Sequence, residues 1–231
     1  MQNNDFIFVS EEKCKEIQSN LNCKIATNNS FDLDDLHYIA GVDLAYWKED
    51  VEKAVCCIVV LDYTTGEIVE EVHSVGEINF PYIPGYLAFR ELPLVMECTE
   101  KLNVKPDLYV FDGNGYLHPR HMGIATHASF FLNKPTIGVA KSYYKIKDTD
   151  FVMPENEKGS FTDIIINGEI YGRVLRTCKN VKPIFISVGN YIDLATSTIV
   201  INKLVRKDSH IPMPTRYADI ATHKMRNLYD K

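Results

Sequence analysis

Hydrophobic and polar positions along the chain change period several times, and each change marks an expected element. Apolar residues follow Ser10 at helical spacing up to Leu21, which predicts an amphipathic helix with a serine at its start. The ranges 38–45, 54–62 and 67–73 are rich in Val, Ile and Tyr, and a Thr-Thr-Gly turn separates the last two. We predict that these ranges form three sequential strands in an antiparallel meander.

Beyond the meander the pattern alternates between helices and strands. Val95 lies on the apolar face of an expected helix whose first turn accommodates Pro93. Strands are expected over 108–111 and 136–140, with a helix between them that Pro135 ends. This alternation predicts parallel pairing, and a right-handed crossover sets the strand over 108–111 beside the first strand of the meander.

The last third of the chain predicts a hairpin, one more strand and two helices. Asn167 and Gly168 form a tight-turn signature between two apolar runs, and a strand is expected over 184–187. Helices are expected over 193–205 and 216–229. The resulting fold class is α/β, with a central mixed sheet of three antiparallel strands plus parallel strands, flanked by helices.

Composition narrows the class of protein. The 231 residues are 45% hydrophobic and 24% charged, which fits one globular domain over residues 1–231 and excludes disorder. No apolar run approaches the ~18 residues of a bilayer span, and the N-terminus lacks the features of a signal peptide. Six cysteines without a CxxC pair indicate reduced thiols and no zinc site. We expect a cytoplasmic monomer that does not contact a membrane.

Charge is unevenly spread along the chain. The net charge is −6, yet residues 171–231 hold 11 Lys and Arg against 4 Asp and Glu, a balance of +7 that leaves −13 for residues 1–170. Such asymmetry permits a local phosphate-binding face, to which Arg173 and Arg176 would contribute a grip independent of sequence. A chance excess of surface lysines is the alternative.

Two aspartates stand out within apolar strands. Asp43 lies inside the range 40–45, and Asp112 directly follows an apolar strand. The predicted topology puts both on neighbouring central strands, where two carboxylates repel each other unless a cation lies between them. Oxygen ligands of this kind suit Mg²⁺ or Mn²⁺. The alternative is that each aspartate only ends its own strand.

The loop after Asp112 adds to the case for a ligand site. Its two glycines allow a close approach of the backbone, and His118 and Arg120 would reach phosphate. Loops at the carboxyl ends of parallel strands commonly bind ligands. Glu91, after a proline-rich loop, would reach back as a third carboxylate.

Several short motifs in this order resemble those of the endonuclease V family. The resemblance runs from about residue 38 to about residue 223 and leaves the N-terminal helix outside it. The family often has Ser-Pro-Gly-His where this chain has Ser187-Val188-Gly189-Asn190, so no role of that histidine is transferred. The matching segments are 41–46, 81–85, 89–91, 112–115, 118–120, 123–127, 135–142, 172–177, 182–183 and 214–219.

The resemblance implies a fold, a reaction and a set of catalytic residues. It implies a ribonuclease-H-like fold and a metal-dependent nuclease that acts on deaminated bases, mainly inosine, and nicks at the second phosphodiester bond 3′ of the lesion. By motif, Asp43 and Asp112 would bind Mg²⁺, with Mn²⁺ as a substitute, and Glu91 would complete the acidic site. Asp219 would be an auxiliary carboxylate, and Lys141 would be the active-site lysine. Without the surrounding motif of residues 138–142, a surface lysine would be the favoured interpretation of Lys141.

The resemblance also implies where the substrate binds. The loop of Pro81, Tyr82, Ile83 and Pro84 would be a wedge that parts the strands at the lesion, since a stiff aromatic replaces lost stacking. Gly113, Gly115 and Gly138 would form walls of the base pocket, where no side chain intervenes, and His118 would contact phosphate. The alternatives are a turn packed on the core for Tyr82 and tight turns alone for the glycines.

The sequence does not decide whether the substrate is DNA or RNA. The expected partner is DNA that contains deaminated bases, and inosine-containing RNA fits the same site chemistry. A binding module without catalysis fits poorly, because Asp43, Glu91 and Asp112 are all present. The spacing of His118, His121 and His127 does not match a zinc site, and the last two are expected on a helix surface or at a cap.

Overall fold

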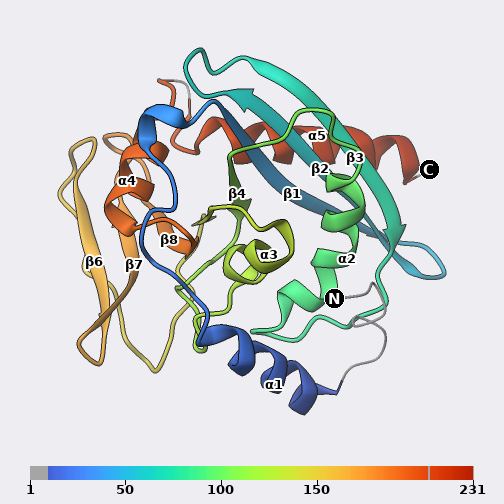
Figure 1. The fold of residues 1–231 in the computed structure, drawn as a ribbon, viewed down its shortest axis with the longest axis horizontal. Coiled ribbons are helices and arrows are strands. Elements are labelled where there is room, and N and C mark those ends of the chain that lie inside the picture. The colour runs from blue at the N-terminus through green and yellow to red at the C-terminus, as the bar shows by residue number, and fades with distance from the viewer. Residues whose placement is uncertain (1–9, 208, 231) are drawn as a thin grey trace.

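One eight-stranded sheet is the framework of the computed structural model, which describes residues 10–207 and 209–230 (Figure 1). The strands are β1 (Tyr38–Lys48), β2 (Glu52–Asp62), β3 (Ile68–Glu77), β4 (Leu108–Asp112), β5 (Thr136–Ala140), β6 (Phe161–Ile166), β7 (Glu169–Leu175) and β8 (Ile184–Asn190). The α-helices are α1 (Glu11–Asn22), α2 (Leu87–Thr99), α3 (Ile124–Leu132), α4 (Leu194–Lys203) and α5 (Met213–Tyr229), and a short 3₁₀ helix, η2, spans Leu33–Asp35.

The sheet has the order β3-β2-β1-β4-β5-β8-β7-β6 and mixes both kinds of pairing. β1 pairs with β4 and β4 pairs with β5 in parallel, whereas β1, β2 and β3 form the predicted antiparallel meander. β8, β7 and β6 continue the sheet in antiparallel pairs. Asn167 and Gly168 have positive φ values of 54° and 84°, as the tight hairpin between β6 and β7 requires. The predicted mixed α/β fold class is confirmed.

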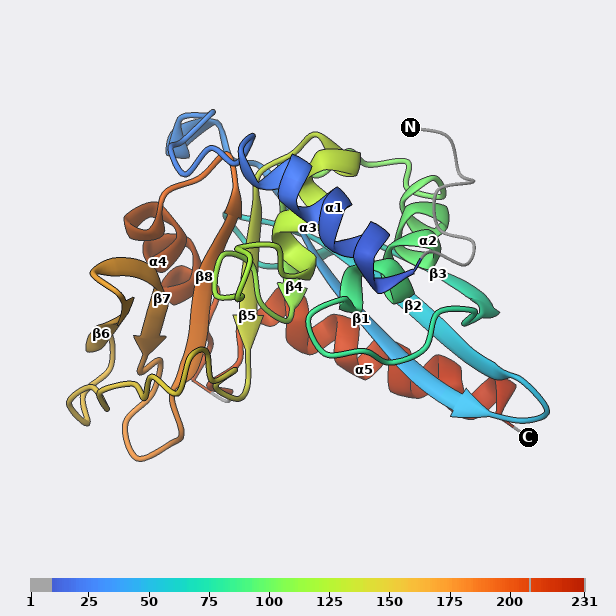
Figure 2. The same ribbon diagram turned by 90° about the horizontal axis from the view of Figure 1, so that it is seen from below.

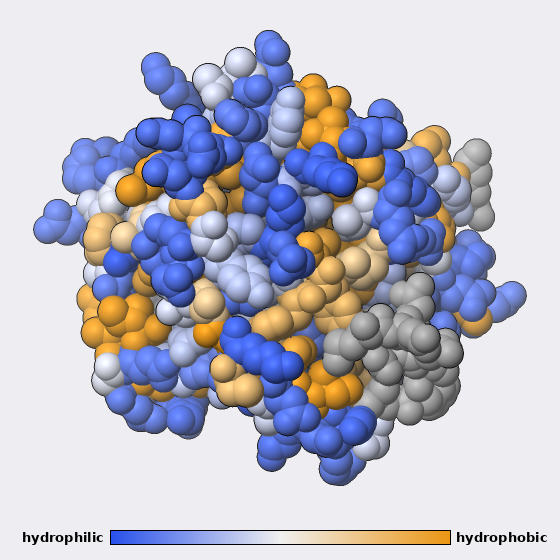
Figure 3. All heavy atoms as spheres, in the orientation of Figure 1, coloured by the Kyte–Doolittle hydropathy of each residue, from blue (hydrophilic) through white to orange (hydrophobic). Residues whose placement is uncertain are grey.

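The helices cover both faces of the sheet (Figure 2). On one face, α4 and α5 pack on alternate strand residues such as Ile39 and Val110, and on the other, α2 and α3 pack on Val42 and Phe111. Both faces of the sheet are therefore apolar, which explains why the sequences of the central strands are nearly continuous hydrophobic runs. Figure 3 shows hydrophobic side chains over β6 and β7, where Ile165 and Ile170 are about half exposed.

Most predicted elements are confirmed, and one helix begins earlier than expected. The hydroxyl of Ser10 caps α1 by accepting the Lys13 N–H. Pro93 lies in the middle of α2 and not in its first turn. The six residues before Pro93 carry their own buried face, including Ala88 and Phe89, and this packing extends the helix toward its N-terminus.

Two further expectations concern targeting and thiols. Among the residues that the structure describes, no helix combines the length and the apolar character that a membrane span requires. Residues 1–9, where no signal peptide is expected, lie outside the described residues. The six cysteines, all within the described residues, form no disulfide, which agrees with the predicted reduced thiols, and four of them are buried.

Candidate active site

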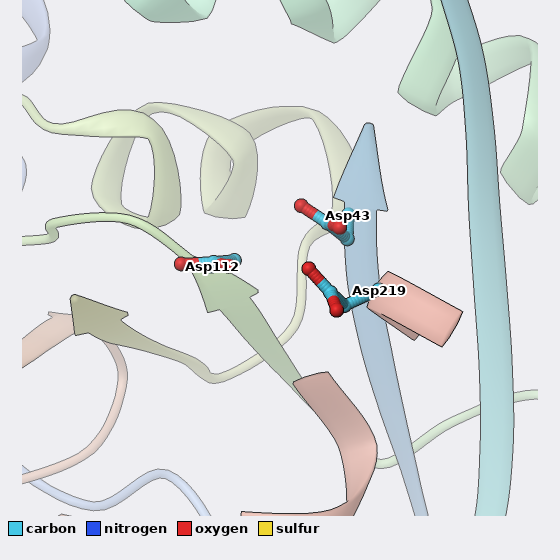
Figure 4. Close-up of side chains that lie close together, drawn as sticks. All are labelled: Asp43, Asp112 and Asp219. Atoms are coloured by element: carbon cyan, nitrogen blue, oxygen red, sulfur yellow. The ribbon is translucent and has the colours of Figure 1, made fainter. Parts of the chain in front are cut away.

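Three aspartates from distant parts of the chain meet at the carboxyl end of the central parallel strands. Asp43 comes from β1, Asp112 ends β4, and Asp219 lies on α5; one carboxylate oxygen of each is within 4.8 Å of the others (Figure 4). Val42 pairs with Phe111 in the parallel register, so the next residues on both strands are the two aspartates. The sequence predicted that Asp43 and Asp112 would meet. The structure adds Asp219 to the same group.

A close helix–strand contact brings Asp219 to the site. Residues 41 and 43 share the strand face that α5 covers, because side chains alternate along a strand. A Cβ on Gly41 would lie 2.0 Å from the carbonyl oxygen of Pro214, so only glycine lets the start of α5 approach β1 this closely. Further along the helix, the Thr222 hydroxyl donates to Asp43 at 3.3 Å, and Asp219 faces the same carboxylate. Helix packing, and not local sequence, therefore completes the acidic group.

Burial and the crowding of carboxylates change the protonation of Asp43. Burial, followed by the neighbouring charge of Asp112, raises the pKa of Asp43 to about 7. Lys141 offsets part of this repulsion, since its Nζ lies 2.7 Å from Asp112 and 3.2 Å from Asp219. Burial alone would lower the pKa of Lys141, but its hydrogen bonds and ion pairs with the two aspartates raise it to about 12. The lysine stays charged while Asp43 titrates near neutrality.

The donor set suits a hard divalent cation. Three carboxylates offer only oxygen ligands, and neither cysteine nor histidine belongs to this group of described residues. Such a set favours Mg²⁺ or Mn²⁺ over zinc. The repulsion that raises the pKa of Asp43 is also the repulsion that a cation between the carboxylates would relieve.

Glu91 lies apart from the three aspartates. It sits on α2, is almost fully buried, and accepts a hydrogen bond from the hydroxyl of Tyr46. Tyr46 lies on the sheet face opposite to that of Asp43, so Glu91 approaches from the α2 side. Burial, together with the charges of Asp43 and Asp112, raises the pKa of Glu91 to about 7, although the hydrogen bond from Tyr46 and the charge of Arg90 lower it. The glutamate is therefore electrostatically linked to the acidic group without joining it.

The loop of residues 81–84 borders a cavity beside the acidic group. Tyr82 is 70% exposed, which matches a projecting aromatic and not a turn packed on the core. The cavity has a volume of about 150 Å³ and lies between this loop, Gly113 and the start of α3, with Tyr82, Pro84, Met122 and Ile124 in its lining. None of the three aspartates lines the cavity, but Asp112 and Gly113 are consecutive, so the acidic group and the cavity meet through the backbone at the end of β4.

Two of the three expected wall glycines do not line this cavity. A Cβ on Gly138 would lie 2.4 Å from the backbone nitrogen of Gly115, and one on Gly115 would lie 2.2 Å from the carbonyl oxygen of Val188. These glycines let the loop after β4 cross β5 and β8 at backbone contact. Only Gly113 of the three is among the lining residues.

His118 lines the cavity and hydrogen-bonds to its backbone, whereas a contact with phosphate was expected. Its Nδ1 accepts the N–H groups of Arg120 and Met122, so Nε2 carries the proton and donates to the carbonyl of Gly85 at 3.0 Å. Burial, helped by the charge of Arg120, lowers the pKa of His118 to about 4. The ring is neutral and both its nitrogens are used, which leaves none for a phosphate.

The other two histidines also differ from the prediction. His127 is completely buried in α3, and its two ring nitrogens have no hydrogen-bond partner among the described residues. Burial lowers the pKa of His127 to about 3, so this histidine behaves as a neutral core aromatic against Phe89. His121 lies in the loop before α3 and stacks on Tyr116 with ring centres 3.9 Å apart. Neither residue lies on a helix surface or at a cap.

The two arginines expected to grip the nucleic acid are engaged inside the protein. Arg173 is paired with Asp163 at 2.7 Å and donates to Thr198. Arg176 is buried, and its guanidinium donates to the backbone carbonyls of Glu155, Pro154 and Val181. Because these donors are satisfied internally, the basic character of the C-terminal third does not translate into a phosphate face at these residues.

The segment that departs from the family pattern is a strand and not a loop. Ser187, Val188, Gly189 and Asn190 all belong to β8. The side chain of Asn190 is buried and accepts the N–H of Ala26, which ties the strand to the segment after α1. These residues therefore extend to Asn190 the strand that was expected over 184–187.

The fold and the acidic group define a ribonuclease-H-like protein. A family model of endonuclease V matches residues 19–220. Endonuclease V of Bacillus thuringiensis subsp. konkukian (strain 97-27) is 62% identical over 216 residues, which cover 93% of this chain and 92% of that protein. The chain belongs to the endonuclease V family, whose members are nucleases that act on inosine-containing nucleic acid.

Solved structures agree with the family assignment. Endonuclease V of Bacillus subtilis has a TM-score of 0.95 and 52% identity, and the comparison covers 100% of this chain and 98% of that one. Endonuclease V of Ciona intestinalis, in complex with a 24mer DNA containing an inosine followed by a ribo-adenosine, has a TM-score of 0.80 and 28% identity over 93% of this chain and 97% of that one. The family match begins at residue 19, inside α1, so the N-terminal helix is partly within the resemblance.

Proposed function

We propose that the chain is one catalytic domain that uses Mg²⁺ to nick nucleic acid at the second phosphodiester bond 3′ of a deaminated base, mainly inosine. The products would carry 3′-hydroxyl and 5′-phosphate ends, and the main substrate would be DNA under repair. The proposal rests on the family and on one geometric feature. Three carboxylates that suit a cation adjoin a cavity with an exposed aromatic at its edge.

This adjacency supports a nuclease that recognises a base at one position and cleaves a phosphodiester bond at another. A lesion nuclease of this kind needs one site for the extruded base and another for the phosphate. Asp112 contributes to the acidic group, while Gly113 lines the cavity, so neighbouring residues serve the two sites. Tyr82 stands at the rim of the cavity, where an aromatic would fill the gap that the base leaves.

Asp43, Asp112 and Asp219 would hold the metal. A bound Mg²⁺ would make a water more acidic and stabilise the charge on the phosphate and the leaving oxygen. Lys141 orients Asp112 and Asp219 through its two ion pairs and keeps a positive charge at the edge of the group, which favours an approaching phosphate. Glu91 and Tyr46 would complete the acidic site from the other face of the sheet.

An inosine-specific ribonuclease is the second candidate. The Ciona intestinalis relative was solved with DNA in which a ribonucleotide follows the inosine, so ribose at that position fits a related site. Recognition of a 2′-hydroxyl can rest on backbone groups, which sequence does not reveal. Both candidates share the acidic group and the cavity.

One experiment tests the proposal and separates the two candidates. End-labelled DNA and RNA strands of the same sequence, with or without a single inosine, are incubated with the protein in Mg²⁺ or in EDTA. We expect one Mg²⁺-dependent product from inosine-containing DNA, cut at the second bond 3′ of the inosine, and none with Asp112→Asn. Faster cleavage of the RNA strand would favour the ribonuclease. Equal cleavage with and without inosine would refute lesion recognition.

A further inference from the structure

The loop of residues 81–84, here called the wedge loop, ends at a carbonyl group that receives unusual support. Gly85 follows the loop with a φ of +85°, a conformation that favours glycine. Its carbonyl oxygen accepts hydrogen bonds at 3.0 Å from the side chains of Gln18, His118 and Arg120. A carbonyl has two lone pairs, so three converging donors saturate this oxygen and fix its direction.

Gln18 joins the wedge loop to α1, the helix that sequence reasoning left without a function. Its side chain is completely buried, and its Nε2 also lies 3.4 Å from the carbonyl of Met122. Its Oε1 accepts the Nε–H of Arg120, so both ends of the amide are used. Gly85 and Met122 line the cavity, whereas Gln18 does not reach it. Figures 1 and 2 show α1 beside the segment that leads from β3 into α2.

The other end of the wedge loop is fixed in a similar way. The guanidinium of Arg90 donates to the carbonyl of Phe80 at 2.7 Å and pairs with Glu52. Hydrogen bonds to the carbonyls of Phe80 and Gly85 therefore hold both ends of the four-residue loop between them. A loop held this way loses little further freedom when a base is forced out of the stack.

We infer that Gln18 is a positioning residue for lesion recognition, acting through the Gly85 carbonyl to hold the wedge loop at the cavity rim. The inference rests on the proposed function, because it assigns a task to the wedge of the same site. Without Gln18, the Gly85 carbonyl loses one donor, and the Nε of Arg120 loses its acceptor inside the protein. The wedge would then shift more freely against the cavity, while the acidic group on β1, β4 and α5 would stay assembled.

The test compares Gln18→Leu with Leu21→Ala. Both residues are buried on α1, but Leu21 makes no contact with the Gly85 carbonyl through a polar group, so its variant reports the effect of weakening α1 alone. We expect Gln18→Leu to raise KM for an inosine-containing duplex about tenfold, the effect of losing one buried hydrogen-bond partner. The single-stranded substrate should lose less, and the Mg²⁺ dependence should stay that of wild type.

A spectroscopic signal reports the wedge directly. With 2-aminopurine next to the inosine in a duplex, and Ca²⁺ in place of Mg²⁺, binding by wild type should increase the fluorescence as the neighbouring bases unstack. Gln18→Leu should give a smaller increase at saturation, and Leu21→Ala should match wild type. Gln18→Glu keeps an acceptor for Arg120 but cannot donate to Gly85, so it should repeat the defect if Gln18→Leu folds poorly.

The outcomes separate the inference from the proposed function. If wild type shows no preference for inosine, the proposed function fails, and the inference fails with it. If wild type prefers inosine but both Gln18 variants keep its KM and its fluorescence change, only the inference is overturned. A Leu21→Ala defect equal to that of Gln18→Leu, in KM and in fluorescence, would also overturn it, because α1 would then act through general stability.

Discussion

Replacing Asp43 by asparagine should make the metal-free protein more stable while it abolishes cleavage. Asparagine has nearly the same shape and can still accept the hydrogen bond of the Thr222 hydroxyl. The substitution removes a carboxylate that is buried beside Asp112, and this carboxylate is also a ligand that the proposed metal site needs. Stability and activity should therefore change in opposite directions.

The size and sign of the effect follow from the pKa of Asp43. Folding raises this pKa from its ordinary 3.8 to about 7, so the folded state holds the proton more tightly and loses stability as pH rises between these values. Three pKa units correspond to about 4 kcal/mol, and relaxation of the site reduces this to about 2–4 kcal/mol above pH 7. At pH 5 the variant should keep only about a third of its gain in the free energy of unfolding over wild type.

The assay is urea unfolding in EDTA, followed by the fluorescence of Trp47, the one tryptophan and a buried residue. Asp43→Asn should shift the midpoint upward at pH 8, with an unchanged slope, and much less at pH 5. Asp50→Asn, at an exposed turn position, is the matched control and should change neither midpoint. Mg²⁺ should stabilise wild type and leave the variant unaffected. A gain that is the same at pH 5 and pH 8 would refute the electrostatic reasoning.

Three further predictions follow from the site. Tyr82→Ala should lose about 1–3 kcal/mol of affinity for an inosine-containing duplex, and less for a single strand; equal losses in a titration of both would remove the wedge role. Arg176→Ala should lower the free energy of unfolding in urea by about 1–3 kcal/mol and leave the salt dependence of DNA binding unchanged, because its guanidinium bonds only to the protein backbone. Ca²⁺ should support binding in a mobility-shift assay without efficient cleavage, because its looser coordination does not hold water and leaving group in line.

The sequence was sufficient for the order of the first four strands and for two carboxylates of the site. Strand patterns and the crossover rule placed Asp43 and Asp112 side by side, and the parallel register of β1 and β4 confirms that placement. Asp219 could be assigned only by resemblance, because its position depends on how closely α5 packs on β1. The contact at Gly41 decides that distance, and it involves residues 173 positions apart, 41 and 214.

Burial explains the residues whose roles were predicted wrongly. His118, His127 and Arg176 carry side chains that often bind phosphate or face solvent, and residue type alone favours those roles. In the structure all three are buried, and His118 and Arg176 use their donors on backbone carbonyls. Sequence patterns give the period of a helix or strand, but they do not reveal which loop will cover a polar side chain. Gln18 escaped notice for the same reason, since its partner Gly85 is 67 residues away.

A cut at a fixed step from the lesion requires a fixed distance between the base pocket and the acidic group. Two pairs of consecutive residues meet this requirement. Arg90 anchors the wedge loop while Glu91 bonds to Tyr46 on β1, the strand that carries Asp43. Gly113 lines the cavity while Asp112 belongs to the acidic group. Because consecutive residues are covalently linked, the wedge-loop anchor lies next to Glu91 and the cavity lining lies next to Asp112, an arrangement that favours the proposed fixed cutting distance.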